Sequence, residues 1–436
     1  MKKTFTNKLK KAAIGSLSIK LVNIALGFFV TIVLANVMTS YEFGIYSYVF
    51  SIASLMSIPA RFGIQKLLLR ETARGMALEN RELVKGLWVW GGSCVIALSI
   101  FSCACYFLVF YFQSLDKQAI YYDTALIGAF LIPLMALASV RAGILQGLGY
   151  IVYAHIPEQL LRPLFFIIIV FIVTTFFLVD MSSEYVIFLH TSVWLFVFII
   201  GVCFLWLKKP ASIDKNLKAK YNCAVWLRAV IPLGLTGVMY QINTYADILI
   251  LGYWVEPEEI GIYRIAIQLA LLIALGMQVV EMFVSPMIAK LYAEGSIKRL
   301  RRLVAICSMV SFVMAGGIYI LLNFVGEFVI EMFFGIDFIK AYTILLVLGF
   351  GQVVSSFFGS LGPLASMTGH EGLAAKCIMA SAIINVLLNF LLIPFFGVMG
   401  AAAATAISVV VRNIYLWFSI FKKVKINSCA VSFFEG

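Results

Sequence analysis

The chain has 436 residues, of which 63% are hydrophobic and 12% are charged, and its formal net charge is +12. Soluble domains carry about 25% charged residues, so this composition excludes a water-covered surface over most of the fold. The positive charge does not indicate nucleic-acid binding, because it lies in short loops and tails between apolar runs, as in the cytoplasmic loops of membrane proteins.

Apolar runs recur along the chain, and each is long enough to cross a membrane. A helix of about 20 apolar residues spans a hydrocarbon core of about 30 Å. The runs cover 14–38, 43–62, 86–112, 120–145, 151–179, 185–207, 225–253, 260–284, 303–331, 341–367, 372–393 and 398–421. They lack the alternating segments of about ten residues that form membrane barrels. The sequence therefore predicts an all-α integral membrane protein with about twelve transmembrane helices.

The loops between these runs alternate in charge. Basic segments lie at 2–11, 70–85, 208–220, 298–302 and 422–425, and the loops between them are acidic or neutral. Cytoplasmic loops are enriched in lysine and arginine. The pattern predicts a multi-pass protein of the bacterial inner membrane with both termini in the cytoplasm. The first helix is expected to stay in the membrane, because no convincing cleavage site follows the basic N-terminus.

Two short patterns recur at nearly the same spacing. Residues 43–46 (FGIY) open the second run and residues 260–263 (IGIY) open the eighth, while Gly149 and Gly369 mark corresponding turns. Repeats with the same orientation are parallel repeats, related by an axis along the membrane normal. We expect two six-helix lobes, 1–212 with the start of the central basic loop and 213–436.

Motifs for catalysis are not found. There is no G-x-x-x-x-G-K-[ST] segment, and Ala374 stands where a His370-Glu371 zinc motif needs its second histidine. The three histidines are dispersed, and the eight cysteines lie mostly inside apolar runs. The sequence predicts a transporter with no catalytic residues, no metal and no cofactor.

Ionisable residues at membrane depth are costly, so each needs a partner, water or a function. Lys20 lies about two turns into the first helix, Arg61 and Lys66 close the second, and Arg141 ends the fourth. Lys20 is either a snorkelling lysine or a contact for a substrate phosphate, and Arg61 and Lys66 are either interfacial anchors or functional residues.

A polar stripe runs along the fifth helix, where His155, Glu158 and Arg162 stand at i, i+3 and i+7. The i, i+4 spacing of Glu158 and Arg162 favours a salt bridge. The alternative is that Arg162 contacts substrate.

The seventh helix is unusually polar and is expected to line water or a partner helix. Its polar residues are Tyr240, Gln241, Asn243 and Thr244. The deeper Asp247 either pairs with Arg264 in the next helix or binds a proton or sodium ion. Glu281, at the other end of the eighth helix, is a second candidate for charge pairing or ion coupling.

A family resemblance rests on motifs that are densest between residues 18 and 73. The segments 43–46, 61–64 (RFGI) and 69–73 (LRETA), and the turn at Leu148-Gly149, are similar to the polysaccharide flippases of the multidrug/oligosaccharidyl-lipid/polysaccharide exporter superfamily, the Wzx-type O-antigen transporters. The likeness covers essentially the whole chain.

The resemblance implies two lobes around a central, often cationic, cavity. It also implies transport of undecaprenyl-pyrophosphate-linked oligosaccharides, of O-antigen or capsule type, from the cytoplasmic to the periplasmic leaflet by alternating access. Lys20, Arg61, Arg141 and Arg264 are the candidate cavity cations, and Tyr240, Gln241 and Asn243 are candidates for facing sugar. A polysaccharide polymerase and a chain-length regulator are candidate partners.

Three alternative functions remain open. An ion-coupled multidrug exporter of the same superfamily would use a titrating carboxylate, with Asp247 as the candidate. A lipid II-type flippase usually carries additional helices. A membrane glycosyltransferase or polymerase typically carries a large outer loop, whereas every outer loop here is short.

Overall fold

The computed structural model describes residues 2–116, 120–177, 180–213, 217–424 and 426–433, with all their side chains except those of residues 2–18, 114–116, 236, 240 and 433. Throughout these ranges the regular elements are helices, with no strand, which confirms the all-α prediction. The first eleven elements are α1 (Lys2–Val37), α2 (Ser40–Arg61), α3 (Ile64–Ala77), α4 (Arg81–Asp116), α5 (Tyr122–Gly128), α6 (Leu131–Gly147), α7 (Ile151–Ile156), η1 (Pro157–Leu161), α8 (Arg162–Ile172), η2 (Val173–Phe177) and α9 (Ser183–Lys208). The remaining eight are α10 (Cys223–Trp254), α11 (Pro257–Ala293), α12 (Ile297–Phe334), η3 (Ile336–Phe338), α13 (Ala341–Phe358), α14 (Leu361–Met367), α15 (Glu371–Val424) and η4 (Ala430–Phe433).

The number of membrane spans follows from these lengths. Ten helices in the described ranges are long and apolar enough to cross a membrane, and the interrupted α10 is one further broken span. At 1.5 Å per residue, the 54-residue α15 is about 81 Å long, more than twice a bilayer core. Its backbone leaves helical geometry at Gly397 (φ 54°, ψ −133°), so α15 contains two spans. The described chain therefore has twelve spans, as predicted.

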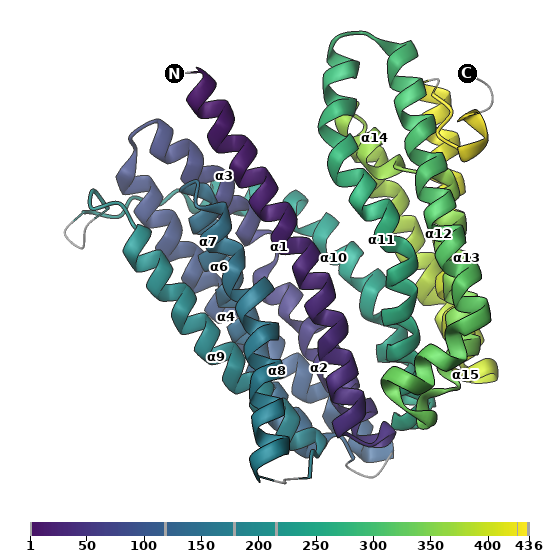
Figure 1. The fold of residues 1–436 in the computed structure, drawn as a ribbon. Helices are drawn as coiled ribbons and strands as arrows, with labels where there is room; N and C mark the ends of the chain where they lie inside the picture. Colours follow the sequence, from purple (N-terminus) through teal and green to yellow (C-terminus); the bar gives the residue numbers. More distant parts are fainter. Residues whose placement is uncertain (1, 117–119, 178–179, 214–216, 425, 434–436) are drawn as a thin grey trace. The chain divides into compact units, whose positions relative to one another are not determined.

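The chain forms two compact units, Met1–Gln241 and Ile242–Gly436, here called unit 1 and unit 2 (Figure 1). The division falls inside α10 rather than in the loop before it. Two hydrogen bonds show why the start of α10 belongs to unit 1. The Lys220 N–H donates to the Glu82 carbonyl at 3.0 Å, and Lys85 Nζ donates to the Leu217 carbonyl at 2.7 Å. The segment before α10 is thereby held against α4.

The repeated turns have repeated geometry. Gly149 and Gly369 have φ values of 87° and 78°. The following N–H groups, of Tyr150 and His370, each reach back five residues to a helix carbonyl at 2.8 Å. This is the Schellman helix cap, which favours glycine in the left-handed conformation. The internal repeat is therefore visible in the backbone of both units.

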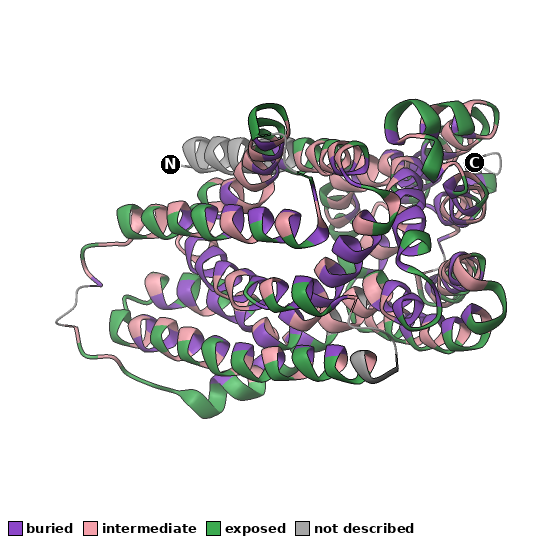
Figure 2. Cartoon of the chain, turned by 90° about the horizontal axis from the view of Figure 1, so that it is seen from below, coloured by how far each residue is buried: buried purple, intermediate pink, exposed green. Residues whose placement is uncertain are grey.

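Burial follows the pattern expected in lipid. Large apolar side chains lie exposed on the helices, among them Trp206 (80% exposed) and Phe324 (86%). Exposed and buried residues alternate along the helices (Figure 2). Small hydroxyl residues occupy the interior, including Ser47, Ser51 and Ser54 of α2. Small residues let membrane helices approach closely. The span of α2 is 78% buried and that of α1 only 17%, so α2 lies at the centre of unit 1.

Candidate functional site

A cavity in unit 1 forms where α2 ends and α3 begins. Two glycines bring this break against the first half of α10. Gly63 has φ +65°, and a Cβ atom there would lie 2.5 Å from the Val230 carbonyl oxygen. A Cβ atom on Gly234 would lie 2.6 Å from the Phe62 ring. Glycine at both positions therefore permits the close packing that shapes this cavity.

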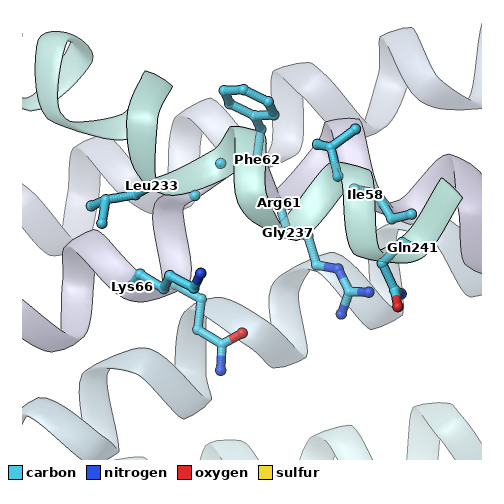
Figure 3. A pocket seen from close by; sticks show the side chains of 11 residues that line it. Ile58, Arg61, Phe62, Lys66, Leu233, Gly237 and Gln241 are labelled. Carbon is cyan, nitrogen blue, oxygen red and sulfur yellow. The ribbon is translucent and has the colours of Figure 1, made fainter. Parts of the chain in front are cut away.

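This cavity, the cationic pocket, has a volume of about 160 Å³, far more than the 10–15 Å³ that a water needs. It is lined by Ile58, Arg61, Phe62, Gly63, Gln65, Lys66, Leu233, Gly234, Gly237, Val238 and Gln241. Its polar lining consists of two cations and two amides. Arg61 and Gln241 enter from α2 and α10, and their polar ends approach each other in the close-up view (Figure 3). Such a lining suits an anionic group rich in oxygen atoms.

A second group of charged side chains, the arginine cluster, lies inside unit 1. It comprises Tyr46, Arg141, Glu158, Arg162 and His190. Arg141 is 2% exposed and forms an ion pair with Glu158 of η1. The same Arg141 donates to the Ala154 carbonyl at 3.3 Å.

The sequence predicts a salt bridge between Glu158 and Arg162, but in the structure Glu158 forms its ion pair with Arg141. Glu158 lies in the π-helical turn η1, where the α-helical spacing behind the expectation does not hold. Arg162 donates instead to the Glu158 main-chain carbonyl and to His190 Nε2, both at 3.2 Å. Glu158 therefore forms an ion pair, as predicted, but with Arg141 rather than with Arg162.

The protonation of His190 follows from its neighbours. A guanidinium has only donors, so His190 Nε2 must accept from Arg162. The neutral ring then carries its proton on Nδ1 and donates to the Tyr46 hydroxyl at 2.8 Å. Phe166 stacks on the imidazole at 4.4 Å, and Arg162 lies 5.2 Å above the Trp194 ring. These contacts fix the position of the Arg162 guanidinium.

Arg141 is enclosed. A Cβ atom on Gly201 would lie 2.6 Å from Arg141 Cζ, so the guanidinium rests directly on α9. Its Nε and Nη1 atoms have no hydrogen-bond partner among the described residues. In this conformation Arg141 holds the ion pair and is closed to a ligand.

Unit 2 contains a buried carboxylate. Asp247 is 4% exposed, and its Oδ2 accepts from the Tyr263 hydroxyl at 2.6 Å. Its Oδ1 accepts from the Ile248 N–H at 2.9 Å. Within the described ranges no ion pair joins Asp247 to Arg264, although this pairing was one of the two predicted alternatives. The carboxylate instead accepts a hydrogen bond from Tyr263, the residue before Arg264. The reason is geometric, because neighbouring residues on a helix point in different directions.

Other polar side chains of unit 2 form hydrogen bonds between α10 and α15 and within α15. Asn243 donates to Ser381 at 3.4 Å, and Ser381 donates to the Ser408 carbonyl at 3.2 Å. Asn385 donates to Thr405 at 3.2 Å and to the Ser408 hydroxyl at 3.3 Å. The described residues include no group of three or more His, Cys, Asp or Glu side chains placed to hold a metal ion.

The predicted cavity residues and the predicted ion-coupling residues are each described within their own unit. Arg61 and Gln241 line the cationic pocket, Arg141 and Arg162 belong to the arginine cluster, and Asn243 and Asp247 belong to the unit 2 network. Lys20 is exposed on α1, while Arg264 and Glu281 are half-buried. The side chain of Tyr240 lies outside the described residues.

Sequence reasoning missed Tyr46, His190 and Tyr263. In the sequence His190 is one of three dispersed histidines, and nothing there indicates its partners. A signal for the tyrosines was present, because Tyr46 and Tyr263 are the fourth residues of the two repeated motifs.

Comparisons with known proteins agree with this architecture. An inward-facing multidrug resistance MATE family transporter of the MOP superfamily superposes with a TM-score of 0.77 at 13% identity, over 95% of this chain and 98% of that one. The lipid II flippase MurJ, in an inward closed conformation, gives 0.71 at 17% identity, over 93% of this chain and 87% of that one. At these identities the likeness concerns the fold, which is that of membrane transporters.

The sequence profile of the family described as "Polysaccharide biosynthesis protein" matches residues 9–292, and the chain belongs to this family. A probable low-salt glycan biosynthesis flippase, Agl15 of Haloferax volcanii, is 23% identical over 208 residues. That match covers 48% of this chain and 42% of the flippase. The chain is therefore a multi-pass membrane protein of this polysaccharide-biosynthesis family.

Proposed function

We propose that this protein is a flippase that carries undecaprenyl-pyrophosphate-linked oligosaccharide units, of O-antigen or capsule type, from the cytoplasmic to the periplasmic leaflet. The observation that carries the proposal is the cationic pocket, where Arg61 and Lys66 lie with two glutamines at the junction of α2 and α3. The family membership and the Haloferax relative support a glycan substrate.

The pocket chemistry matches a sugar-pyrophosphate headgroup. Such a group cannot cross hydrocarbon unaided, because burying its charges without partners is very costly. Arg61 and Lys66 supply charge-assisted hydrogen bonds to the pyrophosphate. The amides of Gln65 and Gln241 supply both donors and acceptors for sugar hydroxyls. The polyprenyl tail remains in lipid throughout.

The proposed direction follows from the loop charges. Arg61 and Lys66 lie next to the basic segment 70–85, which the charge pattern places in the cytoplasm with both termini. The pocket then receives substrate from the cytoplasmic leaflet of the inner membrane. Delivery to the periplasmic leaflet supplies a polysaccharide polymerase and a chain-length regulator.

Asp247 is the proposed coupling residue. Among the described residues it is the one buried carboxylate, at 4% exposed. Its hydrogen-bond partner Tyr263, and Asn243 four residues before it on α10, are neutral oxygen-bearing side chains, which suits a site for a proton or a sodium ion. An ion gradient would then drive the change between inward-facing and outward-facing states.

A second candidate is an ion-coupled multidrug exporter of the same superfamily. The buried Asp247 favours it, since such exporters need a titrating carboxylate. The cationic pocket disfavours it for cationic drugs, because Arg61 and Lys66 would repel a positive charge.

The test uses purified protein in liposomes with a fluorescent polyprenyl-diphosphate oligosaccharide, whose translocation is read by chemical quenching of the outer leaflet. We expect transport by the wild type and its loss in the R61Q/K66Q double variant. Efflux of a cationic dye is measured on the same vesicles. Dye efflux without movement of the lipid-linked oligosaccharide would overturn the flippase proposal in favour of the exporter.

A further inference from the structure

The connection after α2 was expected to be a loop, but residues 64–77 form α3, a helix with two distinct faces. One face, including Ile64, Leu67, Leu68 and Thr72, is buried. The opposite face exposes Lys66, Arg70 and Arg74 at i, i+4 and i+8. These three cations, here called the α3 stripe, therefore lie one above the other along a single line of the helix.

The α3 stripe is held rigidly on unit 1. A Cβ atom on Gly143 of α6 would lie 2.6 Å from the Gln65 carbonyl oxygen, and one on Gly147 would lie 2.7 Å from Thr72 Cβ. Trp88 of α4 donates to the Thr72 hydroxyl at 2.9 Å. Helix α3 is thus clamped between α6 and α4, and its exposed face points in one direction.

The α3 stripe leads into the cationic pocket. Lys66 belongs to both, since it lines the pocket and forms the first member of the stripe. At 1.5 Å rise per residue, Arg70 and Arg74 follow at steps of about 6 Å. The line of cations therefore extends about 12 Å outward from the pocket along the surface of α3.

The stripe can exchange its present contacts for a ligand. The Arg70 side chain is 51% exposed and pairs with the neighbouring Glu71 at 2.9 Å. Exposed ion pairs contribute only about 0–1 kcal/mol, so an incoming phosphate can displace this one. Leu69 (38% exposed) and Leu78 (67%) lie beside the cations, which gives α3 the mixed surface of a helix at headgroup level.

We propose that the α3 stripe is a loading surface for the diphosphate headgroup of the substrate. The headgroup meets Arg74 and Arg70 at the cytoplasmic membrane surface and passes to Lys66 and Arg61 in the pocket. This inference rests on the proposed function and adds a kinetic role for residues outside the pocket. Surface charges of this kind change association rates more than dissociation rates.

The test measures binding kinetics of farnesyl diphosphate to the full-length protein in nanodiscs of zwitterionic lipid. The stripe variant is R70Q/R74Q and the pocket variant is R61Q/K66Q. The matched control is K298Q/R299Q, which removes the same charge from exposed positions at the start of α12, at the corresponding hairpin of unit 2.

We expect R70Q/R74Q to lower the association rate by about tenfold at low salt, to reduce its salt dependence, and to leave the dissociation rate within about twofold. The pocket variant should mainly raise the dissociation rate, and the control should match the wild type. Unchanged association in R70Q/R74Q, with normal wild-type binding, would overturn the loading role alone. No diphosphate binding by the wild type would overturn the proposed function itself.

A second experiment distinguishes binding of the substrate headgroup from binding of ordinary anionic lipid. The same proteins are compared in nanodiscs containing phosphatidylglycerol, an anionic lipid without a diphosphate. If the stripe serves only to hold anionic lipid, R70Q/R74Q will alter phosphatidylglycerol enrichment around the protein and leave diphosphate association unchanged, which overturns the proposal.

Discussion

Tyr46 and Tyr263 occupy equivalent positions in the two repeats, and each hydrogen-bonds a buried ionisable side chain of its own unit. The Tyr46 hydroxyl lies 2.8 Å from His190 Nδ1, and the Tyr263 hydroxyl lies 2.6 Å from Asp247 Oδ2. The same scaffold position therefore supports different chemistry in each half. In unit 1 it fixes a neutral imidazole beside Arg162, and in unit 2 it holds a carboxylate.

Replacing Asp247 by asparagine tests whether this carboxylate couples transport to an ion. The amide oxygen of asparagine still accepts the Tyr263 hydrogen bond and only the acceptor for the Ile248 N–H is lost, so the fold should persist. We expect D247N to bind farnesyl diphosphate like the wild type but to lose the acceleration of flipping by a proton or sodium gradient. Flipping is measured in liposomes with each gradient imposed separately, and E331Q, an exposed acid, is the control. A gradient response equal to that of the wild type would exclude Asp247 as the coupling residue.

Much of the fold could be predicted from the sequence, because span length and loop charge follow directly from the thickness and polarity of a bilayer. The contacts that the charged residues make were harder to predict from the sequence. Glu158 pairs with Arg141 because η1 is a π-helix, and its sequence gives no distinct signal for that geometry. Asp247 meets Tyr263 rather than Arg264, a choice that depends on the rotation of α11 about its axis. Periodicity identified polar helices but did not determine which neighbour each side chain meets.

Arg61 is predicted to act through its planar guanidinium. A hydrogen bond to a charged group contributes about 1.5–3 kcal/mol, so R61Q should weaken diphosphate binding by about 10- to 100-fold. R61K keeps the charge but cannot form two parallel hydrogen bonds, and an intermediate loss is expected. Equilibrium binding in nanodiscs checks both values, with R228Q, an arginine on α10 outside the pocket lining, as the control. Equal affinity of R61Q and wild type would remove Arg61 from the binding site.

The Arg141–Glu158 pair is predicted to be structural. Removing one partner leaves a buried charge unpaired, so E158Q should lower the free energy of unfolding by about 3–5 kcal/mol, nearer the lower value because the Glu158 side chain is 20% exposed. The double variant R141M/E158L removes both charges and should recover most of that loss. Thermal unfolding in detergent measures each variant. Additive losses in the double variant would show that the two residues do not stabilise each other.

Gly63 is predicted to be required for the shape of the cationic pocket. G63A forces an alanine to φ +65°, at a cost of about 1–2 kcal/mol, and places its Cβ 2.5 Å from the Val230 carbonyl. The break between α2 and α3 must then move away from α10, so we expect both lower thermal stability and weaker diphosphate binding. G92A is the matched control, because Gly92 is helical with open space around its Cβ position and alanine should leave stability unchanged or raise it by up to about 1 kcal/mol. If G63A bound farnesyl diphosphate like G92A, the close contact between Gly63 and α10 would not be what forms the binding site.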